Sequence, residues 1–157
     1  VLDTPLGDKY PADVPPNAAL FGNYAIPNPK TVCKNIDFSG RSLIPVRQGY
    51  TKSSVVPVTE NAIITDDVSI ASTAEKNGLA VLLVSKGDVV LPGREYGFIG
   101  GCCGLIAPDT MLFNGSLSSH RDGEKIRAFL SSFGVRAEEA GDFQLTDIGS
   151  ILPLAER

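Results

Sequence analysis

Two adjacent cysteines and a single histidine are the side chains of this sequence best suited to catalysis. Cys102 and Cys103 follow Gly100 and Gly101, and glycines of this kind let the backbone come close to a ligand. A thiolate there could attack an electrophilic carbon, and His120, expected at the N-terminus of a helix, could act as a neutral general base. The alternatives are that the thiols are small buried side chains and that the histidine lies on the surface beside a helix cap.

A second group of residues could bind a polar ligand. The loop 48–54 contains Lys52 and Ser53, so its backbone N–H groups and its lysine charge could hold a carboxylate. It lacks the spacing of a P-loop, and it could equally be a solvated turn. Glu95 could pair with a cationic substrate or only with the neighbouring Arg94. Asp147 lies in an apolar stretch, where a carboxylate either grips a guanidinium through both oxygens or closes a turn before a glycine.

Composition excludes several other classes of protein. The chain has 157 residues, a net charge of −4 and 14 scattered basic residues, so we expect no binding to nucleic acid. No apolar run approaches the roughly 20 residues needed to span a bilayer, so we expect no membrane segment. A single histidine, without CxxC or HxxxH spacing, predicts no metal site, and we expect no cofactor. Three cysteines without a paired framework favour reduced thiols and a cytoplasmic location.

Strands and helices alternate along the chain after a proline-rich extended arm at 1–17. Each predicted helix starts at a capping residue and is followed by a glycine and an apolar strand. We predict a helix at 28–36, a second that is capped by Asp66 or Asp67 and runs to about residue 77, and a third that is capped by Ser118 or Ser119 and runs to about residue 133. We predict strands at 19–26, 42–46, 55–58, 61–65, 79–84, 103–106, 110–113 and from 135 onward, and the segment 147–154 closes the chain.

This pattern predicts a single α/β domain made of three successive strand–helix–strand modules, at about 18–59, 60–108 and 109–157. The first strands open near residues 19, 61 and 110, and intervals of this length are typical of repeat or propeller architectures. The alternative is a small open α/β sheet whose parts merely look alike.

Three stretches of the sequence carry a resemblance to a known family. They are Gln48–Ser54, Leu91–Gly101 and Asp147–Leu154, and the arm at Tyr10–Asp13 adds to them. Through them the chain resembles, over nearly its whole length, an uncharacterised bacterial family of unknown function whose members are longer at the N-terminus.

The order of elements is in turn similar to that of the penteins, α/β propellers that modify guanidine groups. This resemblance implies a strand–strand–helix–strand unit arranged five times around an axis, so three modules would make an incomplete ring. It also implies a cysteine nucleophile near the end of the last module, a histidine in an earlier one and acidic residues that hold the guanidinium. Here the last module offers Asp147, Ile148, Gly149 and Ser150 with no cysteine after them, which departs from that pattern.

These observations leave three functions open. In the first, the protein binds a small polar, guanidino or amino-acid-like ligand in a pocket lined by Lys52, Glu95, His120 and Asp147. In the second, it is a hydrolase or transferase directed at guanidines or amides, which uses one of the paired cysteines with the histidine. In the third, it is a non-catalytic interaction module that associates with itself, or with a missing N-terminal part, through open sheet edges.

Overall fold

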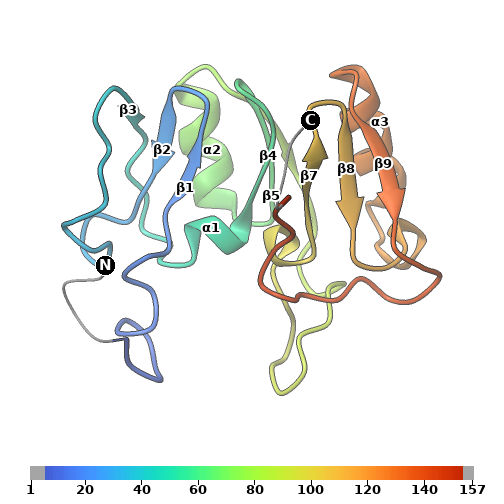
Figure 1. Cartoon of the computed structure of the whole chain (residues 1–157), viewed down its shortest axis with the longest axis horizontal. Helices are drawn as coiled ribbons and strands as arrows, with labels where there is room; N and C mark the ends of the chain where they lie inside the picture. Colours follow the sequence, from blue (N-terminus) through green and yellow to red (C-terminus); the bar gives the residue numbers. More distant parts are fainter. Residues whose placement is uncertain (1–5, 154–157) are drawn as a thin grey trace.

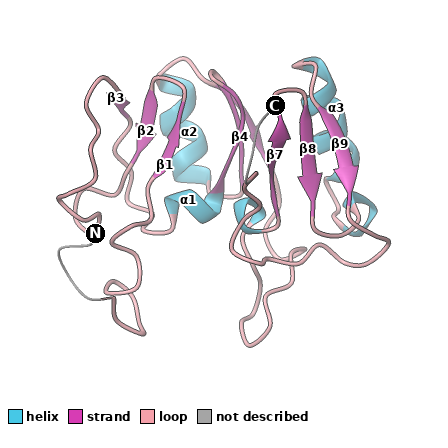
Figure 2. Ribbon diagram, viewed as in Figure 1, coloured by secondary structure: helices cyan, strands magenta, loops and turns pink. Residues whose placement is uncertain are grey.

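The computed structural model describes residues 6–153, which form three three-stranded sheets with two longer helices packed against them (Figure 1). In each sheet the first two strands are antiparallel, and the third strand is parallel to the second (Figure 2). The chain is therefore a mixed α/β protein, as its sequence predicts. The start of the predicted arm and the end of the segment 147–154 lie outside the described residues.

The first sheet consists of β1 (Ala19–Phe21), β2 (Tyr24–Ile26) and β3 (Ser42–Leu43). The single strand predicted at 19–26 is wrong, because the chain turns back on itself at Gly22, whose φ of 45° suits glycine. The third strand is shorter than predicted, and a proline follows it two residues later.

The helix predicted at 28–36 is also wrong, since the structure has only turns there. The Asn28 side chain does not cap a helix. Its Oδ1 accepts a hydrogen bond from the Lys30 backbone N–H at 2.9 Å, and its Nδ2 donates to the Arg47 carbonyl at 2.8 Å. This asparagine therefore closes a local turn and ties the loop to the segment that follows β3.

The second sheet and its helices follow local sequence signals closely. The Asp67 side chain accepts hydrogen bonds from the backbone N–H groups of Ser69 and Ile70, so of the two predicted N-cap candidates Asp67 is the cap. Gly78 takes a φ of 84° just past the helix. The elements are α1 (Thr51–Ser54), β4 (Val55–Thr59), β5 (Ala62–Thr65), α2 (Val68–Lys76) and β6 (Ala80–Leu83).

The third sheet repeats this order of elements with a longer connection before its helix. Ser116 caps a short 3₁₀ turn, and the α-helix begins later than predicted, at Gly123. The elements are η1 (Ile99–Gly101), β7 (Cys103–Ala107), β8 (Thr110–Phe113), η2 (Leu117–Ser119), α3 (Gly123–Ser132) and β9 (Arg136–Glu139). No strand forms at 147–153.

The sheets divide the chain one strand earlier than the predicted modules do. β4 pairs with β5 and β7 pairs with β8, so each of these first strands belongs with the elements that follow it. The two hairpins match in register: Val55 faces Thr65, Cys103 faces Phe113, and both hairpins have an irregularity before their turn. A sequence pattern shows strands but does not show which neighbour each strand pairs with.

The first strands of the three sheets lie side by side, since β4 contacts both β1 and β7, and α1 packs against η1. One apolar cluster joins the second and third sheets to α3, and a second cluster joins the first sheet to α2. No helix within residues 6–153 is long and apolar enough to cross a membrane. The packing therefore brings the beginnings of β1, β4 and β7 together.

Candidate functional site

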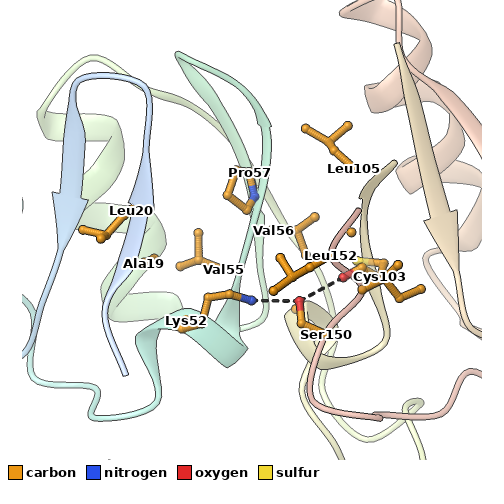
Figure 3. Close-up of a pocket in the computed structure, with 13 residues that line it drawn as sticks. Ala19, Leu20, Lys52, Val55, Val56, Pro57, Cys103, Leu105, Ser150 and Leu152 are labelled. Carbon is orange, nitrogen blue, oxygen red and sulfur yellow. Dashed lines mark hydrogen bonds between the residues drawn. The ribbon is translucent and has the colours of Figure 1, made fainter. Parts of the chain in front are cut away.

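A pocket of about 190 Å³ lies where these three first strands meet (Figure 3). Its walls are largely apolar and include Leu20 from β1, Val56 from β4 and Leu105 from β7. Ser150 and Leu152, from the segment after β9, complete the lining. Side chains from all three sheets and from the end of the described chain therefore share this one pocket.

Lys52 is the charged side chain of the pocket; the other described residues that line it are apolar, glycine, cysteine or serine. Its one-turn helix α1 is held in place by Asn17, whose Oδ1 accepts a hydrogen bond from the Lys52 backbone N–H at 2.7 Å. The side-chain Nζ donates to Ser150 Oγ at 2.8 Å. Burial lowers the pKa of Lys52, and the nearby Cys103 and Asp147 oppose this effect.

Ser150 has a backbone conformation that is unusual for its residue type. Its φ is 138°, the only positive φ of a non-glycine residue within residues 6–153, and it follows Gly149, whose φ is 94°. Such a conformation costs on the order of 1–3 kcal/mol. The Ser150 hydroxyl donates a hydrogen bond to the Cys103 carbonyl at 3.4 Å and accepts the one from Lys52, toward which it points in Figure 3.

Asp147 fixes the turn that carries Ser150. One of its carboxylate oxygens accepts the Gly149 N–H and the other accepts the Phe98 N–H, each at 2.9 Å. Gly101 packs directly against this carboxylate, because a Cβ there would lie only 2.0 Å from Oδ1. Each oxygen accepts one backbone hydrogen bond, so the carboxylate holds this loop in place.

The two adjacent cysteines are buried, and only Cys103 lines the pocket. Both thiols donate to the Ile99 carbonyl, Cys102 at 3.2 Å and Cys103 at 3.3 Å. Hydrogen bonding to Cys103 and burial raise the pKa of the Cys102 thiol, which disfavours its thiolate.

We therefore expect both thiols to be unreactive in the folded protein. All three cysteines of the chain are free and buried, so Ellman's reagent at pH 7.5 should label none of them in minutes and all of them after unfolding in guanidinium. Rapid labelling of one thiol in the folded protein, lost in Cys103→Ala, would contradict this expectation and favour the cysteine-dependent enzyme.

His120 contacts residues other than the two thiols. It is 4% exposed, its Nδ1 accepts a hydrogen bond from the Asp122 backbone N–H at 3.0 Å, and the same nitrogen is 3.9 Å from Asp88 Oδ2. Within the described residues no hydrogen bond or ion pair joins it to Cys102 or Cys103. Its contacts organise the loop between β8 and α3.

The remaining predicted residues are also spread over different places. The Ser53 hydroxyl accepts a hydrogen bond from Asn17 Nδ2 at 3.3 Å and does not line the Lys52 pocket. Glu95 is exposed and lines a separate, open depression of about 360 Å³ beside Tyr50, whose hydroxyl binds Asp13 at 2.6 Å. No group of three or more His, Cys, Asp or Glu side chains in the described part of the chain is arranged to hold a metal ion.

The structure thus joins Lys52, Cys103 and Asp147 around one turn and leaves His120 and Glu95 elsewhere. Ser150 is the residue of this site that the sequence interpretation did not single out. Its only local signal is its place after a glycine in the otherwise apolar stretch that follows Asp147, and such a signal is weak.

Solved structures define the class of this fold. The C. jejuni agmatine deiminase superposes with a TM-score of 0.56 at 10% identity, covering 86% of this chain and 55% of that one. A cysteine-to-serine variant of the C. jejuni agmatine deiminase with substrate bound superposes with a TM-score of 0.54 at 10% identity, covering 78% of this chain and 48% of that one. The inosamine-phosphate amidinotransferase StrB1 from Streptomyces griseus superposes with a TM-score of 0.49 at 12% identity, covering 96% of this chain and 52% of that one. The superpositions on the agmatine deiminase make the fold pentein-like. The chain spans about half the length of these proteins.

The chain belongs to a family of unknown function, DUF6873, whose model matches residues 2–152. No curated protein matches the chain by sequence. The predicted resemblance to an uncharacterised family and to the penteins is thereby confirmed.

Proposed function

We propose that the Lys52 pocket binds a small molecule with a carboxylate and a short apolar body, such as an amino-acid-like acid. The observation that carries this proposal is a half-buried ammonium group that forms no ion pair with any carboxylate in residues 6–153. The Lys52 ammonium instead donates a hydrogen bond to the neutral Ser150 hydroxyl. A charge in an apolar pocket is stabilised by an opposite charge, which the ligand would supply.

The shape of the pocket limits the ligand to a small one. A lysine ammonium has three donors, so after its bond to Ser150 it can still donate to a carboxylate. The volume of about 190 Å³ is below the ~300–1,000 Å³ of drug-sized ligand sites. Leu20, Val56, Leu105 and Leu152 would contact the apolar part of the ligand. A carboxylic acid with a short side chain meets these constraints.

A guanidino ligand suits this pocket less well than a carboxylate. Agmatine, the compound in the name of the C. jejuni deiminase, carries a positive guanidinium that Lys52 would repel. Asp147, the carboxylate nearest to the serine turn, already accepts two backbone hydrogen bonds. The fold is shared with guanidine-modifying enzymes, but the charge of this pocket favours an anion.

The same proposal includes an arrangement of the three sheets as part of a propeller. Each sheet has the same strand order and directions, and the first strands lie next to one another, as they would around a common axis. A second copy of the chain, or a further part of the protein, would supply the remaining sheets and enclose the pocket.

Replacing Lys52 by methionine should weaken carboxylate binding by at least about 10-fold, since a hydrogen bond to a charged group contributes about 1.5–3 kcal/mol. The measurement is a titration of ¹⁵N-labelled protein with propionate, butyrate, alanine and 4-aminobutyrate, followed by amide shifts of residues that line the pocket. Lys76→Met is the matched control, because Lys76 also lies in the last turn of its helix but is exposed. Equal binding by wild type and Lys52→Met would overturn the proposal, as would the absence of saturable shifts with every acid.

A further inference from the structure

We propose that Ser150 is the nucleophile of an acyl-transfer reaction, with Lys52 as its general base and small neutral esters or amides as its substrates. The proposal rests on the proposed function, because it uses the same pocket and makes the bound carboxylate the product of the reaction. It goes beyond binding in assigning a catalytic pair that contains no cysteine.

The distance between the two side chains is that of a nucleophile and its base. Lys52 Nζ and Ser150 Oγ are 2.8 Å apart, although 98 residues separate them in the chain. A serine paired with a lysine is one of the recurring solutions to nucleophile activation, and it needs no histidine. Figure 3 shows the Lys52 side chain extending from α1 toward Ser150, which lies on the segment after β9.

The backbone of Ser150 gives an independent indication of function. A non-glycine residue with positive φ is strained, and such strain is concentrated at catalytic and ligand-binding positions. Here the strain is maintained by the Asp147 carboxylate, by the Ile148 N–H bound to the Gly101 carbonyl at 3.0 Å, and by the Ile151 N–H bound to the Cys103 carbonyl at 3.4 Å. These contacts hold the serine hydroxyl against the lysine.

Burial lowers the pKa of Lys52, which makes it easier for the ammonium to lose a proton and become the amine that can act as a base. The side chain lies among apolar walls, its burial lowers its pKa, and no carboxylate in residues 6–153 forms an ion pair with it. Asp147 opposes this effect, but its oxygens are directed to backbone N–H groups. When the amine has taken up a proton, the resulting ammonium can hold a carboxylate product.

The reaction balances with water as the second reactant. Once Lys52 has lost a proton to solvent, the Ser150 hydroxyl turns from the Cys103 carbonyl to donate to the amine. The Lys52 amine then takes the proton of this hydroxyl while Oγ bonds to the carbonyl carbon of the substrate. The tetrahedral intermediate expels the alcohol or amine, which takes the proton back from Lys52, and an acyl-serine ester remains. Lys52 then takes a proton from water as the hydroxide adds to the acyl carbon. Ser150 Oγ leaves with that proton, and a carboxylic acid is released that ionises in solution.

The test uses 4-nitrophenyl acetate and butyrate as substrates and diisopropyl fluorophosphate as a covalent probe of the serine. Wild type should release 4-nitrophenolate and acquire one phosphoryl adduct, which peptide mass spectrometry places on Ser150. Ser150→Ala should reduce the rate of 4-nitrophenolate release and the rate of adduct formation to the uncatalysed background. Lys52→Met should reduce both rates by about 100-fold or more. Ser72→Ala, which removes an exposed hydroxyl from α2, should match wild type.

A second variant separates catalysis from folding. Ser150→Gly removes the hydroxyl and relieves the positive φ, so it should be inactive and yet raise the melting temperature by roughly 2–4 °C. An adduct on another residue, or equal turnover by wild type and Ser150→Ala, would overturn the proposal. If carboxylates bind through Lys52 while no serine adduct forms, the nucleophile proposal fails and the binding proposal stands. If Ser150 is labelled while no carboxylate binds, the binding proposal fails.

Discussion

Replacing Asp66 by asparagine should raise the free energy of unfolding at pH 7.5 by roughly 2–3 kcal/mol. Asp66 is 4% exposed, and within residues 6–153 its Oδ1 has no hydrogen-bond partner. Burial raises its pKa from 3.8 to about 6, against the opposing effects of Lys86 and of the Ile99 backbone N–H. A carboxylate that is harder to ionise in the folded than in the unfolded protein destabilises the folded state wherever it is charged.

The sign of this effect determines its pH dependence. Between pH 3.8 and about pH 6 the folded state binds more protons at Asp66 than the unfolded state, so this carboxyl's contribution to stability falls as the pH rises. The contribution is complete below pH 3.8 and lost above about pH 6. The advantage of Asp66→Asn should therefore shrink on acidification and vanish near pH 4.

Urea unfolding of wild type and Asp66→Asn between pH 4 and pH 8 measures this difference. The difference between the two proteins is needed because carboxyls such as Asp122, whose pKa is lowered by its bond to Lys125, lose stability on acidification in both. Asp142→Asn is the control, because Asp142 is exposed. A stability difference that stayed constant over this pH range would refute the assignment of the effect to ionisation of Asp66.

Replacing Gly101 by alanine should lower the free energy of unfolding by about 2–4 kcal/mol. The new Cβ would lie 2.0 Å from Asp147 Oδ1 and 2.2 Å from its Cγ. The carboxylate cannot move aside without weakening its hydrogen bonds to Phe98 and Gly149. Ser150 would move with it, so the pocket should lose its Lys52–Ser150 contact as well.

A double-mutant cycle separates this collision from other effects of the methyl group. Removing the carboxylate in Asp147→Ala also removes the obstacle, so Gly101→Ala should cost at least about 1 kcal/mol less in that background. Gly141→Ala serves as the control, since its Cβ would meet only the ring of Phe143, which is exposed and can turn away. Equal costs of Gly101→Ala with and without Asp147 would show that the carboxylate does not hold this glycine in place.

Local sequence patterns predicted the second unit of the fold well. The strand predicted at 61–65 and the helix predicted to end near residue 77 correspond to β5 and α2, with Asp67, one of two predicted caps, at the start of the helix and Gly78 just past its end. These elements depend on hydrogen bonds and apolar spacing within a few residues of the chain. The residues that determine these elements are therefore close together in the sequence, where a local pattern can reveal them.

The failures lie where distant partners decide the local conformation. Asn28 and the proline after it read as a helix start, but the asparagine instead donates to the carbonyl of Arg47, 19 residues away. Lys52 reads as part of a polar loop, but Asn17 and the packing against η1 fold it into the single turn α1. Similarly, the residues of β4 and β7 do not indicate whether each strand pairs with the strand before it or with the strand after it in the chain.

The sequence by itself determined the α/β class, the family and the supply of polar side chains, because these follow from local periodicity and from residue types. Only the tertiary structure decided that Lys52 meets Ser150, while His120 and Glu95 remain elsewhere. The periodicity of a strand or helix predicts the face on which each side chain lies, but it does not predict which other element will pack against that face. A contact across 98 residues depends on how the sheets pack, and so does the strained turn that aims the serine.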